Sequence, residues 1–123
     1  MKIIVVDDEP IIADTLVNIL NGEGHSAVAV SDGRSAIRWA EMLRPEAIIT
    51  DVIMPGLNGV ETAKEILKVL PTCRIILFSG QAASTDLVAR ARSEGFCFEI
   101  LAKPINPDVL LERLKNCPGA SVP

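Results

Sequence analysis

The feature that most constrains the fold is a regular alternation of short apolar runs with longer amphipathic stretches. Five short runs, most of them rich in Ile and Val, occupy residues 3–6, 27–30, 47–50, 74–78 and 98–102. Runs of this length that are apolar almost throughout are typical of strands buried on both faces of a parallel sheet. We therefore expect each run to form one strand of such a sheet.

The stretches between the runs have the period of helices with one buried face. Apolar residues recur there at spacings of three and four, which predicts helices at 11–21, 34–43, 59–70 and 85–94 and a last helix that begins at Pro107. Asn58 with Glu61 resembles a capping box, and Asn106 is placed to cap the last helix. Each predicted strand is thus followed by a helix.

Five strand–helix units predict an α/β fold, with a parallel sheet covered by helices on both faces. A chain of 123 residues is too short for a closed eight-fold barrel, so a doubly wound open sheet remains. For five strands we choose the flavodoxin-like order 2-1-3-4-5 with five helices. The domain is expected to span residues 1–116, and residues 117–123 are expected to be a flexible tail or the start of a linker.

Composition excludes several classes of function. The net charge of −4 argues against binding of nucleic acid or of an anionic membrane by this domain, because both partners favour a basic face. No apolar run approaches the length of a membrane span, and the N-terminus lacks the pattern of a signal peptide. The three cysteines form no CxxC pair and are expected to be reduced thiols. These features indicate a cytoplasmic protein.

Polar residues follow the predicted strands where each strand ends. Asp7 and Asp8 follow the first strand, Asp51 the third, Ser79 the fourth and Lys103 the fifth. In a doubly wound sheet, ligands bind outside the carboxyl ends of the strands, where the strand order reverses. We therefore expect these five side chains to meet at one edge of the sheet.

This set of residues favours phosphoryl transfer. Clustered carboxylates raise one another's pKa unless a cation compensates them, and Mg²⁺ binds one or two carboxylates while leaving room for phosphate oxygens. Lys103 and Ser79 are suited to contact phosphoryl oxygens. Asp51 is alone on its strand, and an aspartate that attacks phosphorus forms an acyl phosphate, so we expect Asp51 to be the nucleophile.

At this point the sequence resembles the receiver domain of two-component response regulators. The matching segments are "IIVVDDEP", "AIITDVIMPGLNGVE", "IILFSGQ" and "ILAKP", and the resemblance extends to about Lys115. It implies a phosphorelay signalling domain that takes a phosphoryl group from a phosphohistidine in a sensor histidine kinase, or in a phosphotransfer protein, and then switches its interactions with partners. It also implies self-catalysed phosphorylation and dephosphorylation rather than turnover of a free substrate.

The resemblance implies a role for each site residue. Asp51 corresponds to the phosphoacceptor, Asp8 to a direct Mg²⁺ ligand and Asp7 to its supporter, mainly through water. Asp51 and the backbone carbonyl of Ile53 correspond to the other metal ligands, Ser79 to the switch hydroxyl and Lys103 to the lysine that pairs with the phosphoryl group. The Lys103–Pro104 bond is typically cis in this family.

Two positions bear on the switch and on the lifetime of the acyl phosphate. Many receivers have Tyr or Phe three residues before the lysine, whereas this chain has Ile100, so the aromatic half of the usual switch is not carried over. Ile53 and Gln81 correspond to positions near the attacking water. Because an isoleucine side chain cannot orient water, we expect slow autodephosphorylation.

The sequence leaves alternatives open. A Mg²⁺-dependent phosphatase with an aspartate nucleophile usually needs a second acid two residues later, where this chain has Ile53. A flavin or nucleotide binder of the same fold would need a phosphate loop, and no GxxxxGK[ST] motif follows the first strand. A degenerate receiver that binds partners without phosphorylation is disfavoured by the intact set of five residues. A homodimer through the fourth and fifth helices is left undecided.

Overall fold

The computed structural model describes residues 1–80, 82–96 and 98–116, without the side chains of residues 82–85. Five parallel strands form one sheet in the order β2-β1-β3-β4-β5. The strands are β1 (Lys2–Val6), β2 (Ser26–Val30), β3 (Ala47–Asp51), β4 (Arg74–Ser79) and β5 (Glu99–Ala102). The predicted fold class and strand order are confirmed.

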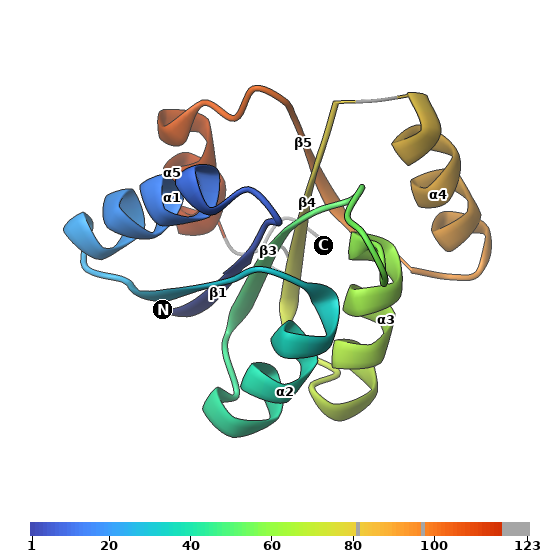
Figure 1. Cartoon of the computed structure of the whole chain (residues 1–123), viewed down its shortest axis with the longest axis horizontal. Coiled ribbons are helices and arrows are strands. Elements are labelled where there is room, and N and C mark those ends of the chain that lie inside the picture. The colour runs from blue at the N-terminus through green and yellow to red at the C-terminus, as the bar shows by residue number, and fades with distance from the viewer. Residues whose placement is uncertain (81, 97, 117–123) are drawn as a thin grey trace.

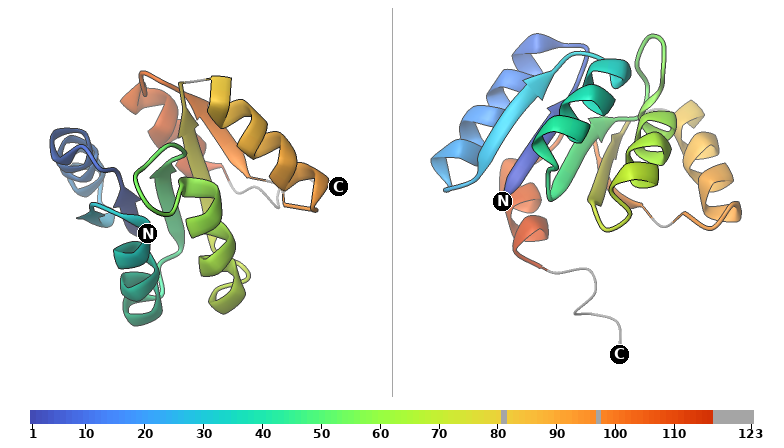
Figure 2. Two further views of the ribbon diagram at one scale, coloured as in Figure 1. Left: turned by 45° about the vertical axis from the view of Figure 1, so that its right-hand side comes forward. Right: turned by 90° about the horizontal axis from the view of Figure 1, so that it is seen from below.

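Five helices cover the two faces of the sheet (Figure 1). They are α1 (Pro10–Gly22), α2 (Gly33–Leu43), α3 (Gly59–Val69), α4 (Ala82–Ser93) and α5 (Pro107–Lys115). Helices α1 and α5 lie on one face and α2, α3 and α4 on the other, so the sheet is the middle of three layers (Figure 2). None of the helices described here is long and apolar enough to cross a membrane.

The core has two halves, one on each face of the sheet. Alternate residues of β1 divide between them: Ile3 and Val5 pack with Leu16, Leu20 and Leu110, beneath α1 and α5. Ile4 and Val6 pack in the other half, which also contains buried residues of α2, α3 and α4. A strand whose two sets of side chains are both buried must be apolar at every position, which explains the continuous Ile and Val runs.

Short-range signals set the starts of three helices. The Asp32 side chain caps α2 by accepting a hydrogen bond from the Ser35 N–H, at 2.8 Å. Asn58 and Glu61 form the predicted capping box at the start of α3. Asn106 caps α5 by accepting from the Asp108 N–H, with proline in the first turn as predicted. Because α3 and α5 begin just beyond site-bearing strands, these caps help to fix the chain at the site.

Every element boundary except the start of α4 lies within one residue of the prediction, and two of the differences have a physical reason. Helix α4 begins at Ala82, three residues before the predicted start, because alanine has the highest helix propensity. Strand β5 begins at Glu99, because Phe98 is buried ahead of the strand and stacks on Phe96, with 5.7 Å between the ring centroids. The expectations for the tail at 117–123, for Cys97 and Cys117, and for the Gln81 position lie outside the described residues.

Candidate functional site: an acid cluster at the carboxyl edge of the sheet

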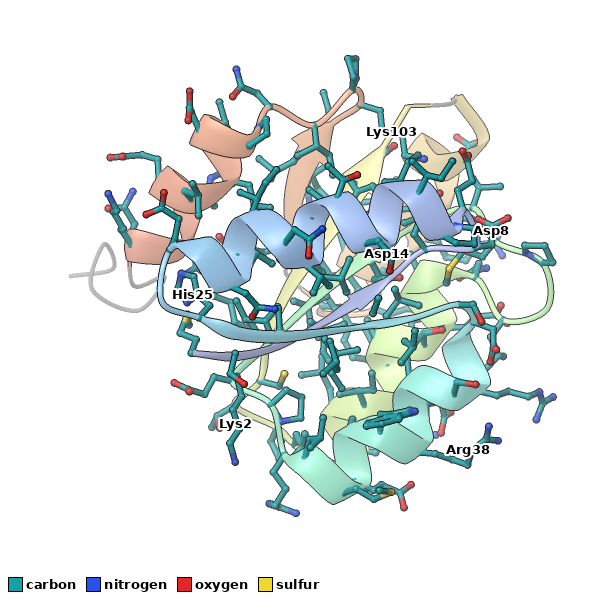
Figure 3. All side chains as sticks on the ribbon, turned by 60° about the vertical axis from the view of Figure 1, so that its left-hand side comes forward. Lys2, Asp8, Asp14, His25, Arg38 and Lys103 are labelled. Carbon is teal, nitrogen blue, oxygen red and sulfur yellow. The ribbon has the colours of Figure 1, made fainter. Side chains whose placement is uncertain are left out.

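The five predicted site residues all lie at the carboxyl edge of the sheet. Asp51 is the last residue of β3 and Ser79 the last of β4, while Asp7 directly follows β1 and Lys103 directly follows β5. The strand registers are level there, since Asp51 pairs with Phe78 and Ser79 with Ala102. In Figure 3, Asp8 and Lys103 lie at one end of the molecule, and Lys2 and His25 lie at the opposite end.

Three of these residues form a compact acid cluster. Carboxylate oxygens of Asp7, Asp8 and Asp51 all lie within 4.8 Å of one another. Asp7 is fully buried and Asp51 is 5% exposed, whereas Asp8 faces solvent. Two of the three negative charges are therefore largely removed from water, which is costly unless a cation is near.

Asp7 has one satisfied oxygen and one unsatisfied oxygen. Oδ1 accepts a hydrogen bond from the Glu9 N–H at 2.8 Å, but Oδ2 is buried and has no hydrogen-bond partner among the described residues. Burial is the main cause that raises the pKa of Asp7, and the charges of Asp51 and Asp8 raise it further. The Glu9 N–H and the charge of Lys103 oppose this shift. The positive charge near Asp7 is thus too small to offset its burial.

Asp51 is held by contacts to both of its carboxylate oxygens. Lys103 Nζ donates to Oδ2 at 2.8 Å, and the Ile53 N–H donates to Oδ1 at 3.3 Å. The Lys103 N–H donates to the Ser79 carbonyl at 3.1 Å, and the Lys103–Pro104 peptide bond is cis as expected. These contacts fix the position of the carboxylate and bring β3, β4 and β5 together around it.

The donor set fits a divalent cation. An unsatisfied, buried carboxylate oxygen on Asp7 lies beside oxygens of Asp8 and Asp51, and oxygen donors of this kind suit Mg²⁺. A bound cation would offset the repulsion within the cluster and supply the partner that Asp7 Oδ2 lacks. This fit rests on the residues alone.

Asp51 opens onto an apolar groove of about 580 Å³. The lining includes Asp51, Ile53, Phe78, Gly80 and Lys103, together with residues of α1 such as Ile11. Ile11 is 82% exposed, which is high for an isoleucine. The groove gives a reactant access to a carboxylate that is otherwise almost buried.

The remaining predicted positions lie close to this edge. Ser79 is half-buried at the end of β4. Ile100 is half-buried and packs against the core beneath α3 and α4, and Phe98 is buried there rather than near Ser79. The structure therefore has no aromatic side chain at the position where many receivers have one.

Comparison with known proteins assigns the family. The sequence model of the response regulator receiver domain family matches residues 3–115, which is nearly the whole chain. This chain belongs to the response regulator receiver domain family. It is a signalling domain and not an enzyme of the usual kind.

The relatives differ in length from this receiver domain. It is 29% identical to the DNA-binding response regulator MtrA of Mycolicibacterium smegmatis, covering 93% of this chain and 49% of that protein. It is 31% identical to the transcriptional regulatory protein TcrA of Mycobacterium tuberculosis, covering 94% of this chain and 45% of that protein. The chain therefore spans about half the length of these two relatives.

Solved structures of single receiver domains match the whole fold. The chemotaxis protein CheY4 of Vibrio cholerae superposes with a TM-score of 0.83 at 28% identity, covering 93% of this chain and 95% of that chain. A receiver domain protein from Clostridium thermocellum gives a TM-score of 0.85 at 30% identity, covering 94% and 91% of the two chains. The receiver fold is thus present from its first strand to its last helix.

Sequence reasoning missed two residues that shape the site. The backbone of Gly59, at the start of α3, lies so close to the Asp51 carbonyl that a β-carbon on Gly59 would overlap it. The sequence places Phe78 only in the predicted strand 74–78, yet its ring lies beneath the ammonium group of Lys103. The available signal for Phe78 was its register, because it is the β4 residue that pairs with Asp51.

Proposed function

We propose that Asp51 accepts a phosphoryl group from a phosphohistidine of a sensor histidine kinase or of a phosphotransfer protein. The observation that carries the proposal is the setting of this carboxylate. It lies at the mouth of a groove, bonded to Lys103 Nζ at 2.8 Å and adjacent to the carboxylates of Asp7 and Asp8. Such a site holds a nucleophile in position and surrounds it with groups that can balance phosphoryl charge.

The proposed step is a displacement at phosphorus. A carboxylate oxygen of Asp51 forms the new O–P bond while the P–N bond of the phosphohistidine breaks. The imidazole nitrogen keeps the electron pair of that bond and then takes a proton from solvent. Lys103 is placed to move its hydrogen bond from Asp51 Oδ2 to a phosphoryl oxygen, and the Ser79 hydroxyl is the proposed donor to another.

Mg²⁺ is the proposed cofactor, held by Asp7, Asp8, Asp51 and the carbonyl of Ile53. When bound, it would neutralise charge on the carboxylates and on the transferred group. Asp7 contributes the oxygen that has no other partner among the described residues, and Asp8 contributes the oxygen nearest to solvent. The proposed self-catalysis of phosphorylation and dephosphorylation follows from this arrangement, because all of the charge-balancing side chains belong to the receiver itself.

Partners and location are part of the same proposal. The relatives named as DNA-binding or transcriptional regulators are about twice as long as this chain, so we propose that phosphorylation acts on a further domain or on a separate partner protein. With a net charge of −4, the receiver itself is not proposed to bind DNA. A cytoplasmic location and a homodimer through α4 and α5 remain proposals.

The direct test is phosphorylation by a small phosphodonor. The protein is incubated with Mg²⁺ and acetyl phosphate or phosphoramidate, and intact mass spectrometry measures the gain of one phosphoryl group. We expect the adduct on the unmodified protein and none on Asp51→Ala. Asp14→Asn, which changes an exposed aspartate of α1 outside the cluster, is the matched control and should keep the adduct. An adduct that persists in Asp51→Ala would contradict the assignment.

Ile53 offers a separate test of the lifetime of the acyl phosphate. Its half-buried side chain lines the groove beside Asp51 and cannot hydrogen-bond a water molecule. We expect Ile53→Asn to shorten the half-life of the phosphoryl group severalfold, as measured by the decay of the adduct after the donor is removed. A half-life equal to that of the unmodified protein would show that this side chain does not set the rate.

A further inference from the structure

The aromatic ring of Phe78 faces the functional ammonium group of Lys103. Lys103 Nζ lies 5.4 Å from the ring centroid, which is within the range of a cation–π contact. Phe78 is fully buried, and it lines the same groove as Asp51 and Lys103. The lysine therefore has two partners at its charged end, the Asp51 carboxylate and an aromatic face.

The last two residues of β4 and the glycine that follows them contact Lys103 along its whole length. The Ser79 carbonyl accepts the Lys103 N–H at 3.1 Å. A β-carbon on Gly80 would lie between 3.0 and 3.6 Å from three side-chain carbons of Lys103, so the lysine stem runs over the bare glycine backbone. Phe78 then lies under the ammonium group. The Phe78–Ser79–Gly80 segment is thus a seat for one lysine side chain.

A flexible lysine in this cluster needs such a seat. Its ammonium group is attracted by Asp7 as well as by Asp51, and its four-carbon stem loses substantial rotamer freedom when it is held in one place. The ring attracts the cation through its negative face, but it does not occupy a directed hydrogen bond. The N–H donors of Lys103 therefore stay available for Asp51 and for an incoming phosphoryl oxygen.

We propose that Phe78 is a positioning residue for Lys103: its ring holds the ammonium group over Asp51 and so sets the rate of phosphoryl transfer. This inference rests on the proposed function, because phosphoryl transfer at Asp51 is the reaction that Lys103 would serve. Phe78 itself is not proposed to contact the phosphoryl group or a bound metal. Its role is separate from its packing in the core.

The first test changes the electrostatics of the ring with little change in its shape. Mono-, di- and trifluorinated phenylalanine are incorporated at position 78, and the rate of phosphorylation by phosphoramidate is measured by intact mass. Because fluorine withdraws the negative charge of the ring face, the rate should fall stepwise, by about two- to fivefold with three fluorines. The matched control is the same series at Phe98, a buried ring over which no described residue places a cation. A Phe78 series no steeper than the Phe98 series would overturn the proposal.

The second test does not depend on phosphorylation. Protons near an aromatic face have shifted NMR signals, so Phe78→Leu should move the signals of the Lys103 side chain toward ordinary lysine values while other lysines keep theirs. Lys103 signals that stay in place would overturn the contact. If the unmodified protein gains no phosphoryl adduct at all, the proposed function fails, and this NMR result still decides whether Phe78 positions Lys103.

Discussion

Charged side chains are removed from water both where the strands begin (the amino edge of the sheet) and where they end (the carboxyl edge). The two edges differ in how fully these charges are paired. At the amino edge, the side chain of Arg74 is 8% exposed, and it bonds both oxygens of Glu99 at 2.5 and 2.7 Å. Its guanidinium also donates to the carbonyls of Arg113 and Leu114 at the end of α5. At the carboxyl edge, three carboxylates face one lysine, and Asp7 Oδ2 has no partner among the described residues.

The difference is between charge that is paired within the protein and charge that is left without a full set of partners among the described residues. A bidentate arginine–carboxylate pair that also binds helix carbonyls uses nearly all of its donors within the protein. A buried carboxylate oxygen without a donor is unfavourable, and it is retained where a cation or a reaction needs it. The same sheet therefore has a self-sufficient amino edge and a carboxyl edge at which one buried carboxylate oxygen has no partner among the described residues.

The largest predicted effect on stability comes from removing Arg74 at the amino edge. Arg74→Ala would leave Glu99 without its partner and would free the last carbonyls of α5, so we expect the free energy of unfolding to fall by about 3 kcal/mol. Chemical denaturation measures it. Phosphorylation of the folded protein should persist, because the site lies at the other edge.

A double change provides the control for this prediction. Arg74→Met with Glu99→Leu removes both charges together and should recover most of the lost stability, since no charge is then left unpaired. A double variant as unstable as Arg74→Ala would mean that the hydrogen bonds from the guanidinium to the carbonyls of α5, rather than the ion pair, account for the loss.

At the acid cluster, removing a charge is expected to raise the free energy of unfolding rather than to lower it. Asp7→Asn removes a buried charge while its side-chain oxygen can still accept from the Glu9 N–H. In EDTA we expect the variant to be more stable than the unmodified protein by about 2 kcal/mol, which is the typical cost of an unsatisfied buried group. Added Mg²⁺ should stabilise the unmodified protein by mass action and the variant much less. Urea titrations with and without Mg²⁺ measure both effects, and a variant less stable in EDTA would contradict the comparison.

A smaller effect distinguishes two acids at the same edge. The Ser35 N–H bonded to Asp32 lowers the pKa of Asp32, whereas burial raises that of Asp7. Asp32→Ala should cost about 1 kcal/mol near neutral pH through the lost cap of α2. A lowered pKa means that the folded state favours the ionised form, so this contribution is present above the ordinary value of 3.8 and is lost as the pH falls further, through the folded-state pKa.

The neutral cap of α3 tests this pH dependence. Asn58→Ala removes a cap of similar geometry that carries no charge, so its cost should not change across the same acid range. Thermal unfolding measured across that range for both variants gives the comparison. Parallel profiles would show that the charge of Asp32 adds nothing to its cap.

The smallest effect is expected from a pair that belongs to neither edge. Lys68 and Glu65 form an ion pair at 2.8 Å on the surface of α3, with both side chains well exposed. Lys68→Gln should change the free energy of unfolding by less than about 0.5 kcal/mol, because solvent screens such pairs. A loss of stability comparable to that of Arg74→Ala would show that this exposed ion pair stabilises the protein as much as the buried one.

Much of this arrangement could be predicted from the sequence. The strands were predictable because a strand buried on both faces needs an apolar residue at each position, as in Ile3–Val6. The meeting of Asp7, Asp51 and Lys103 followed from parallel strands, whose carboxyl ends share one edge.

What could not be predicted depends on register and on side-chain direction. Arg74 and Glu99 are 25 residues apart, and only the pairing of β4 with β5 brings them together. Asp7 and Asp8 look equivalent in the sequence, but Asp7 is fully buried and Asp8 is exposed, although their carboxylate oxygens lie within 4.8 Å of each other. The contact between Phe78 and Lys103 depends on both factors.

The hydrogen bonds from Arg74 to the end of α5 have a consequence for any longer protein that contains this domain. Strand β4 begins at Arg74 and ends five residues along at Ser79, so the two edges are about 17 Å apart at the usual rise per residue. The end of α5, from which the chain would continue toward a further domain, lies at the edge far from Asp51. A structural change caused by phosphorylation would have to extend along the whole length of the strands to reach such a domain. A protein docked at the groove would instead contact the phosphoryl group directly.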